Sequence, residues 1–273
     1  MARRLFSIPR TLLAVACAAP LALAGCLGGP SAYELGEVPS AEDLYREGRE
    51  ILAEGSEFLW LFDTTDYQGA INKFQDIIDN YPYSDYAVLA ELAIADTFYQ
   101  EEKWEEALSY YRDFAGLHPD HPRVAHTLLR TALCHYKQSR DEGRDQTFTR
   151  LAVKNLDQVQ RRFPHSPEAA EAETLWLQLR TRLGSHVLMI GDFYLDREEF
   201  QSAAERYRSV LNDYPGLGLD PEALYKLGVC FESMQREEEA SRIFQVILDN
   251  YGDTEIAEAA AEFLPEQQVP AAN

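Results

Sequence analysis

Positive charge is scarce in this chain. Its 273 residues include 25 Lys and Arg against 46 Asp and Glu, which gives a formal net charge of −21. A protein that binds DNA or RNA needs a basic face to neutralise phosphates, so this deficit argues against a nucleic-acid partner. The acidity does not indicate disorder, because 46% of the residues are hydrophobic and can build a packed core.

The chain has a single marked hydrophobic run, near the N-terminus, and no other apolar stretch is long enough to cross a membrane. That segment, residues 11–23, follows a positively charged start and is too short, and too interrupted by Pro20, to be read as a membrane span. It ends in Leu-Ala-Gly-Cys at 23–26, an order that indicates a lipobox, where a signal peptidase cuts before a cysteine that carries lipid. We predict that residues 1–25 are a lipoprotein signal peptide and that Cys26 carries the lipid, with palmitate among its acyl chains.

An ordinary signal peptide with an incidental cysteine is the alternative interpretation. Acyl chains on Cys26 would anchor the protein by burying methylene groups at roughly 0.8 kcal/mol each. The next residue, Leu27, is not the Asp that retains enterobacterial lipoproteins at the inner membrane, so by similarity it points to the outer membrane. We therefore expect a lipid-anchored protein on the periplasmic face of the outer membrane.

Cysteine is rare, with four residues in all. Cys17 leaves with the signal peptide and Cys26 is assigned to the lipid, which leaves Cys134 and Cys230. A disulfide between them is possible in an oxidising periplasm, but distant repeats of a solenoid rarely touch. We predict two buried free thiols.

Motifs of catalysis are absent: the chain has no His-Glu-x-x-His, no Gly-x-Ser-x-Gly, no Walker loop and no Gly-x-Gly-x-x-Gly after a strand. His118, His121 and His126 lie close together, but a metal site would need a further ligand with suitable geometry. We interpret them as part of a turn between repeats. The sequence predicts no enzyme activity, no cofactor and no metal. A peptidoglycan-cleaving lipoprotein would need a catalytic glutamate in a separate compact domain, and no segment remains to form one.

An internal repeat is present instead. Five helix-like segments each carry a small residue, a large residue four positions later and an apolar residue three positions after that, which places all three on one helix face. Four of the segments end shortly before a proline, which stops a helix, and the fifth has Gly252 at that place. The five sets are Ala70/Phe74/Ile77, Ala107/Tyr111/Phe114, Ala152/Leu156/Val159, Ala203/Tyr207/Val210 and Ala240/Phe244/Ile247.

Upstream helices carry a matching pattern of a small residue followed by an aromatic residue three positions later. The pairs are Ala95/Phe98, Gly191/Tyr194 and Gly228/Phe231. Small residues let two antiparallel helices approach closely, and the aromatic residues fill the space to the next pair. This is the tetratricopeptide (TPR) pattern, so we predict an all-α protein, an α-solenoid of about five TPR repeats.

The repeat period lengthens from 37 to 45 to 51 residues between successive prolines. The excess lies in a polar loop at 139–146 and in a long helix that begins at the Ser166-Pro167-Glu168 cap and runs to about Asp196. We expect this helix to join an N-terminal half (40–165, repeats one to three) to a C-terminal half (166–264, repeats four and five). Residues 26–39 are predicted to be a flexible tether, and residues 265–273 a disordered tail.

Helix starts are marked by caps in two further places. Ser40 with Asp43 reads as a capping box, and Asp220 is predicted to be an N-cap followed by Pro221 at the first helical position.

Aromatic residues crowd the first two repeats, and Phe74, Phe98 and Tyr111 occupy core positions of the repeat pattern. Four are less constrained by the repeat pattern and are candidates for lining a groove that holds an extended peptide. They are Trp60, Tyr83, Tyr86 and Tyr110.

The lipobox, the five TPR-like repeats and the polar loop in the third repeat together resemble the BamD family, the lipoproteins that assemble outer-membrane β-barrels. The likeness is carried by residues 66–100, by His-Pro-Asp-His-Pro at 118–122, by Arg-Asp-Gln-Thr-Phe-Thr-Arg at 144–150 and by residues 203–215. The stretch at 144–150 is the most specific, because a generic TPR chain has no reason to carry it.

The resemblance implies that the C-terminal repeats bind the periplasmic (POTRA) region of the barrel-forming assembly protein. It also implies that unfolded outer-membrane β-barrel proteins bind the N-terminal repeats, and it raises accessory assembly lipoproteins as further partners. An Arg of the penultimate helix pair faces the barrel-forming protein in the family, and the matching position is Arg206. Without the resemblance, Arg206 would read as a solvent-exposed helix residue.

A periplasmic TPR adaptor of the kind that coordinates cell division with the Tol system is the alternative function. Such adaptors usually have an N-terminal coiled coil and no lipobox, and this chain shows the reverse.

Overall fold

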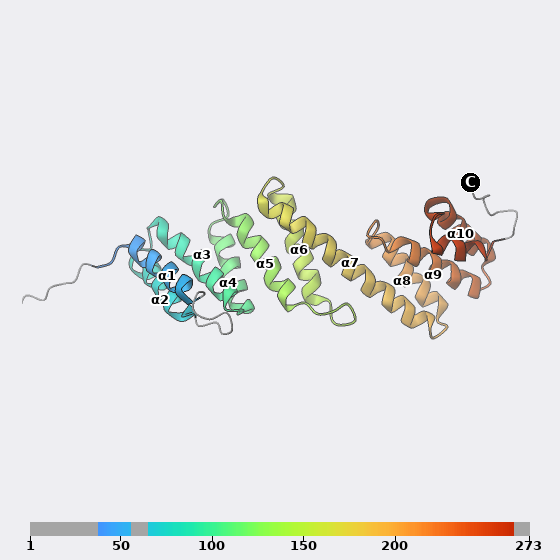
Figure 1. Ribbon diagram of the computed structural model, residues 1–273, viewed down its shortest axis with the longest axis horizontal. Helices are drawn as coiled ribbons and strands as arrows, with labels where there is room; N and C mark the ends of the chain where they lie inside the picture. The colour runs from blue at the N-terminus through green and yellow to red at the C-terminus, as the bar shows by residue number, and fades with distance from the viewer. Residues whose placement is uncertain (1–37, 56–64, 265–273) are drawn as a thin grey trace, which may run out of the picture. The chain divides into compact units, whose positions relative to one another are not determined.

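The computed structural model describes residues 38–55 and 65–264, and all the regular structure in these residues is helical (Figure 1). The predicted signal peptide, Cys26, nearly all of the tether, Trp60 and the tail at 265–273 lie outside the described residues. The helices are α1 (Ala41–Gly55), α2 (Tyr67–Asn80), α3 (Asp85–Gln100), α4 (Trp104–Leu117), α5 (Val124–Gln138), α6 (Thr147–Arg162), α7 (Pro167–Leu195), α8 (Phe200–Asp213), α9 (Asp220–Ser233), α10 (Glu237–Tyr251) and α11 (Glu255–Ala261).

Each helix packs mainly against its neighbours in the chain, as expected of a solenoid. Beyond consecutive pairs, the appreciable contacts between described helices join α1 to α3, α5 to α7 and α9 to α11. The first ten helices therefore form five hairpins, from α1/α2 to α9/α10, and the predicted α-solenoid of five TPR repeats is confirmed.

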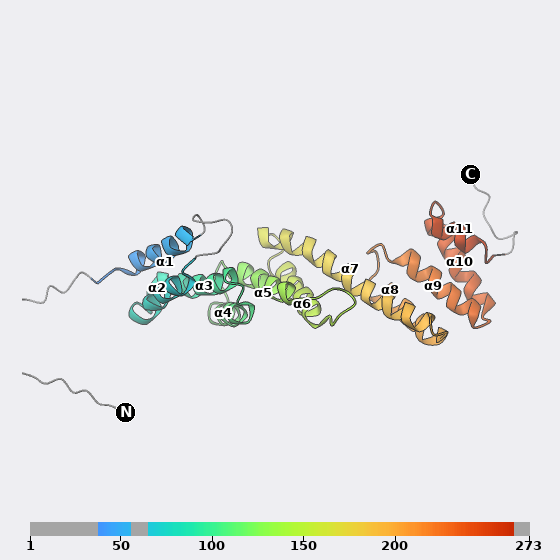
Figure 2. The same cartoon turned by 60° about the horizontal axis from the view of Figure 1, so that its bottom comes forward.

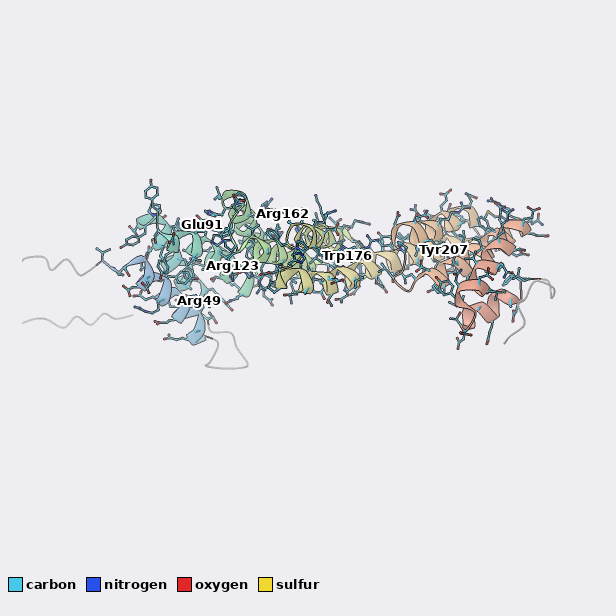
Figure 3. All side chains as sticks on the ribbon, turned by 90° about the horizontal axis from the view of Figure 1, so that it is seen from above. Arg49, Glu91, Arg123, Arg162, Trp176 and Tyr207 are labelled. Carbon is cyan, nitrogen blue, oxygen red and sulfur yellow. The ribbon has the colours of Figure 1, made fainter. Side chains whose placement is uncertain are left out.

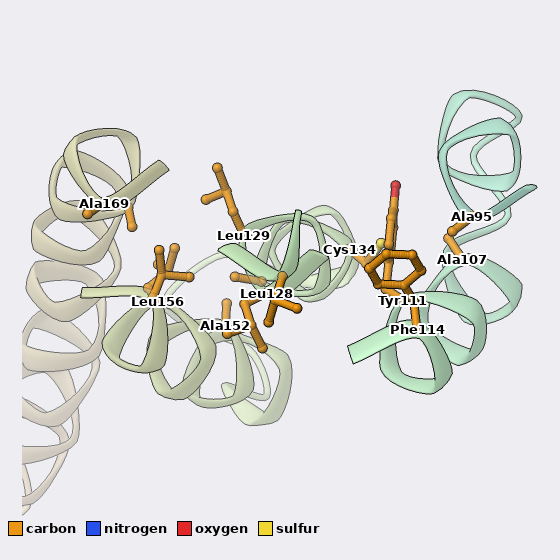
Figure 4. Packing of buried hydrophobic residues seen from close by; sticks show 14 of the residues in the cluster. Ala95, Ala107, Tyr111, Phe114, Leu128, Leu129, Cys134, Ala152, Leu156 and Ala169 are labelled. Carbon is orange, nitrogen blue, oxygen red and sulfur yellow. The ribbon is translucent and has the colours of Figure 1, made fainter. Parts of the chain in front are cut away.

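The second helix of every hairpin buries the three residues that the sequence pattern singles out. All fifteen are at most 1% exposed. Figure 4 shows the middle of this core, where Tyr111 and Phe114 of α4 lie close to Ala95 of α3, and Leu156 of α6 lies toward Ala169 of α7. The spacing of four and then three residues keeps this face continuous, so that each second helix packs against helices on both sides.

Small residues on the first helices allow these rings to approach. A methyl group added at Gly191 would lie 2.5 Å from a ring carbon of Tyr207, and one at Gly228 would lie 2.6 Å from a ring carbon of Phe244. Gly48 of α1 meets Phe74 in the same way, at 2.6 Å, which shows that α1 is the first helix of repeat one. The close approach of the two helices in these hairpins thus requires glycine.

Caps and prolines set the ends of the helices. Four second helices, α2, α4, α6 and α8, end two residues before a proline, as predicted. The Ser40 hydroxyl accepts from the Asp43 backbone N–H at 3.1 Å, and the Ser166 hydroxyl caps α7 by accepting from the Ala169 N–H. The prediction for Asp220 was wrong by one position: Asp220 is the first residue of α9, and its carboxylate instead accepts from the Gly216 N–H at 3.0 Å.

Helix α7, with 29 residues, is about twice as long as its neighbours and belongs to two packing clusters. Its first half packs on α6, where the Trp176 indole N–H donates to Asp157 at 2.8 Å. Its second half is the first helix of repeat four, and its Gly191 lies against the Tyr207 ring of α8. Figure 3 labels Trp176 and Tyr207. At 1.5 Å per residue the helix is about 43 Å long, which is enough to serve both clusters.

Helix α11 is an element that the sequence analysis missed. It follows the Thr254 N-cap and packs against α10 (Figure 2). Its Ala257 and Ala260 are both at most 1% exposed. Within residues 38–55 and 65–264, no helix combines the length and apolarity needed to cross a membrane.

The two remaining thiols are buried and unpaired. Cys134 of α5 and Cys230 of α9 are both 0% exposed and free, as predicted. Burial raises the pKa of Cys134 to about 12 and that of Cys230 to about 11, because an ionised thiolate would lose its hydration.

Candidate partner-binding surfaces

The aromatic groove candidates differ in how much surface they offer. Tyr83 lies in the turn between α2 and α3 and is fully exposed, at 101%. Tyr86 is half-buried on α3 and packs against Tyr45 of α1, with ring centres 5.7 Å apart. Tyr110 is half-buried on α4, with its ring centre 5.3 Å from that of Phe98. Tyr83 is therefore free to meet a partner, whereas Tyr86 and Tyr110 offer only part of a ring.

Arg206 is exposed on α8. No carboxylate of the described residues forms an ion pair with it, in contrast to Arg242 of α10, which pairs with Glu238. The nearby Arg208 instead makes a cation–π contact, with its guanidinium 5.0 Å from the ring centre of Phe231. Arg206 is thus a cation that remains available to a carboxylate from outside the chain.

The three clustered histidines pack in and beside the turn between α4 and α5. His118 contacts the Glu91 carboxylate at 2.8 Å and the Phe114 ring, and His121 meets the same ring edge-on. His126 instead contacts Asp96 at 3.0 Å. In the described part of the chain, no group of three or more His, Cys, Asp or Glu side chains is arranged to hold a metal ion.

A partly buried polar link joins three helices of the N-terminal repeats. Asp96 of α3 accepts a hydrogen bond from the Tyr111 hydroxyl of α4 at 2.6 Å and contacts His126 of α5. Burial opposes ionisation of the Asp96 carboxyl, yet the hydrogen bonds from His126 and Tyr111 hold its pKa below the usual value. Burial and the adjacent carboxylate together raise the pKa of Tyr111.

A second link repeats this arrangement in the C-terminal repeats. Asp192 of α7 accepts from the Tyr207 hydroxyl of α8 at 2.8 Å and from the Lys226 ammonium of α9 at 2.7 Å. Lys226 also pairs with Glu222. Burial alone would lower the pKa of Lys226, but its bonds to the two carboxylates raise it.

The polar loop at 139–146 is closed by one buried side chain. Gln146 is 1% exposed and its amide donates to the carbonyls of Asp141 and Arg144, while the Thr149 hydroxyl donates to its Oε1. The loop is also tied to α7, since Arg182 donates to the Ser139 hydroxyl at 3.2 Å. Two residues of the family-like stretch 144–150, Gln146 and Thr149, therefore shape the loop.

The sequence analysis did not identify the two polar links. A signal for them exists: a small residue followed by Asp, with Tyr fifteen positions after the Asp, occurs as Ala95-Asp96 with Tyr111 and as Gly191-Asp192 with Tyr207. The third partner has no such signal, because it is a histidine thirty residues after the aspartate in one link and a lysine thirty-four residues after it in the other.

This chain is similar to a family of outer membrane lipoproteins and to individual proteins. The family model described as an outer membrane lipoprotein, YfiO, matches residues 40–247. The outer membrane protein assembly factor BamD of Caulobacter vibrioides is 27% identical over 242 residues, which cover 88% of this chain and 75% of the relative. BamD of Rickettsia prowazekii is 26% identical over 231 residues, which cover 85% of this chain and 87% of the relative. Among solved structures, a thermophilic TPR protein of Thermus thermophilus aligns with 82% of this chain and 98% of its own, at 18% identity and a TM-score of 0.35.

Proposed function

The chain belongs to the BamD family of outer membrane lipoproteins, and on this premise we propose that it is a non-enzymatic assembly factor for outer-membrane β-barrel proteins. The observation that carries the proposal is the family match over residues 40–247, which begins before α1 and ends within α10. All five hairpins thus contribute to the match. The Tol-type adaptor is not favoured by this match.

The mechanism is binding without a chemical step. The C-terminal repeats dock on the POTRA region of the barrel-forming assembly protein, and the N-terminal repeats receive unfolded β-barrel proteins in extended form. Tyr83 is the first candidate for substrate contact because its whole ring is exposed. Trp60 is a further candidate for substrate contact, proposed from the sequence pattern alone. Tyr86 and Tyr110 contribute only the exposed part of each ring.

Arg206 is the proposed contact with the barrel-forming protein. Its support is a guanidinium that no carboxylate of the described residues pairs with, on the first hairpin of the proposed C-terminal half. A charge-assisted hydrogen bond to a partner carboxylate is stronger than a neutral one and orients the two proteins. Accessory assembly lipoproteins would join the complex at other surfaces.

Reversing the charge at Arg206 tests this contact. Arg206→Glu should reduce co-purification of the barrel-forming protein, because two carboxylates would then face each other. Arg242→Glu is the matched control, since it makes the same charge change at an exposed arginine whose ion pair on α10 is worth little. Circular dichroism should show equal helicity in both variants.

Unaltered recovery of the barrel-forming protein with Arg206→Glu would remove this residue from the interface. Recovery of Tol proteins in place of any large barrel protein with periplasmic repeats would contradict the proposed function itself.

The membrane anchor is proposed to be lipid on Cys26, which places the repeats on the periplasmic face of the outer membrane. Holding the chain on the membrane raises the local concentration of both partners. Replacing Cys26 by Ala should abolish labelling by radioactive palmitate. Labelling that persists in this variant would contradict the lipobox.

The long helix α7 is proposed to connect a substrate-binding half at 40–165 with a partner-binding half at 166–264. Its support is that residues near its start pack in one hydrophobic cluster and residues near its end pack in another. A continuous helix without proline beyond its first turn transmits position better than a loop would.

A further inference from the structure

A groove with a positively charged rim is formed by helices α4, α5 and α6. Helix α5 packs against both neighbours, whereas α4 and α6 make no appreciable contact with each other, and a cavity of about 490 Å³ remains between them. Leucines from all three helices line it: Leu108 of α4, Leu128 of α5 and Leu151 of α6. A cavity of this size is large enough for several side chains of a bound peptide.

The rim of the groove carries Arg112 of α4 and Lys154 of α6, both exposed. Asp and Glu outnumber Lys and Arg by 46 to 25 in the chain, yet none of the residues that line the groove is acidic. Neither rim cation has an ion-pair partner among residues 38–55 and 65–264. The groove is therefore a local reversal of the charge that dominates the protein.

Of the three helices that line the groove, α5 and α6 extend this reversal. Helices α5 and α6 together carry six Lys and Arg and a single acid, Asp157. Asp157 is occupied, because it accepts from the Trp176 indole and pairs with Arg161. Arg150 and Lys154 stand one turn apart on α6, a spacing at which like charges destabilise a helix. An anionic group bound beside Lys154 would relieve this repulsion.

One titratable residue lines the groove without adding to its positive charge. His135 of α5 lines the cavity, and its Nδ1 is buried without a hydrogen-bond partner in the described residues. Burial, and secondly the charge of Arg112, lower the pKa of His135, which favours the neutral ring. The positive charge at the groove therefore comes from Arg112 and Lys154 and not from His135.

We propose that this groove binds an extended acidic segment of a partner protein, with an apolar side chain against Leu108, Leu128 and Leu151 and carboxylate side chains at Arg112 and Lys154. Charge complementarity selects this occupant, because an acidic peptide is otherwise repelled by a chain of net charge −21. The groove uses none of the residues assigned above to substrate or to the barrel-forming protein, and Tyr110 of α4 packs toward Phe98 instead.

A synthetic probe tests the proposal directly. The probe is a fluorescent ten-residue peptide, Gly-Ser-Glu-Leu-Phe-Glu-Leu-Asp-Gly-Ser, with both ends blocked so that it carries no terminal carboxylate. Fluorescence anisotropy with the purified full chain should show saturable binding that weakens as salt is raised. Lys154→Glu and Arg112→Glu should each weaken binding roughly tenfold or more, because each reverses a charge that faces a carboxylate.

Arg161→Glu is the matched control, because it reverses a charge two turns further along the same helix without lining the groove. It should change the affinity by less than about twofold, in line with a solvent-exposed charge outside the interface. Lys154→Gln provides a milder second variant, and circular dichroism verifies that each variant is folded.

Three outcomes would overturn the proposal. Equal binding of a peptide with Gln and Asn in place of Glu and Asp would show that charge is not recognised. Binding only when the peptide has a free C-terminus would assign the rim to a terminal carboxylate. A dimer in sedimentation equilibrium that Lys154→Glu dissociates would identify the occupant as a second copy of this chain.

Discussion

Helices α3 and α7 both place an aspartate directly after a small residue, and both aspartates bind a tyrosine fifteen residues later. In α3 the pair is Asp96 with Tyr111, and in α7 it is Asp192 with Tyr207. Both tyrosines are 0% exposed, so each hydroxyl must find its acceptor inside the protein. These two hydrogen bonds show that a TPR hairpin can bury a tyrosine where other repeats have Phe or Leu, provided that the preceding helix supplies a carboxylate.

The two links differ in the base that the next helix contributes. His126 completes the N-terminal link, where the Asp96 side chain is 25% exposed, and Lys226 completes the C-terminal link, where the Asp192 side chain is 37% exposed. Lys226 is also held by Glu222, so the C-terminal link has a second acid. In the more enclosed N-terminal link, His126 thus contacts a single carboxylate, that of Asp96. In the more open C-terminal link, Lys226 pairs with two carboxylates, those of Asp192 and Glu222.

Removing either tyrosine ring should have the largest effect and should be equal in the two regions. Tyr111→Ala and Tyr207→Ala each leave a cavity in the core and should cost about 3–5 kcal/mol of unfolding free energy. Urea denaturation followed by helical circular dichroism measures this. Tyr83→Ala, at a fully exposed position, is the control and should change little. A ring that proves dispensable in one region would break the equivalence of the two links.

Removing the aspartate carboxylates should lower the free energy of unfolding by different amounts in the two regions. Asp96→Ala leaves the buried Tyr111 hydroxyl without its acceptor and should cost about 1–3 kcal/mol, and Asp192→Ala should fall toward the lower end of that range. The difference is expected because Asp192 is more exposed and because Lys226 keeps Glu222. The same urea measurement ranks the two variants. A larger loss for Asp192→Ala would reverse the comparison.

Acid should weaken the N-terminal link in a defined direction. The pKa of Asp96 is lower in the folded protein than in the unfolded chain, so its contribution is present above about pH 4, near the unfolded value, and is lost as the pH falls further through the folded pKa. Stability measured between pH 5 and pH 2 should fall less steeply in Asp96→Asn than in the unsubstituted protein. If stability fell equally steeply with pH in the two proteins, Asp96 would not contribute to the loss of stability in acid.

The smallest expected difference between the two regions is in the reactivity of their buried thiols, which can be measured without any substitution. Cys134 and Cys230 lie next to the two links, on α5 and α9, and their pKa values are raised to about 12 and about 11. At pH 8 a pKa near 12 leaves roughly one thiolate in ten thousand, and one near 11 leaves roughly one in a thousand. Ellman's reagent should react slowly with both in the native state, and more slowly with Cys134. Rapid native-state reaction of Cys134 would show that the N-terminal repeats open more readily than the C-terminal ones.

Much of the fold was predictable because the information is local. The small–large–apolar spacing within each second helix identifies its buried face, and Pro82, Pro119, Pro164 and Pro215 mark where the helices end. The Ser166 cap likewise located the start of α7, and the polar loop at 139–146 separated α5 from α6. The misassigned cap at Asp220 has a local cause too, since its carboxylate turned back to the Gly216 N–H in place of the helix that follows.

The candidate surfaces were less predictable, because exposure depends on helices far apart in the chain. Tyr83 and Tyr86 stand three residues apart and look equally unconstrained, yet one is fully exposed and the other packs on Tyr45 of α1. Neither pattern nor propensity reveals such a contact between residues about forty positions apart. The same holds for the groove between α4 and α6, which combines residues from 108 to 158.

The sequence by itself determined the all-helical repeat architecture and the hairpin cores, because the residues that specify them recur at fixed short spacings on single helices. Only the tertiary structure decided which carboxylate meets which base, which aromatic rings remain exposed, and where basic side chains gather on an acidic protein. Those features depend on distances between side chains of different helices, and the packing of whole hairpins sets such distances.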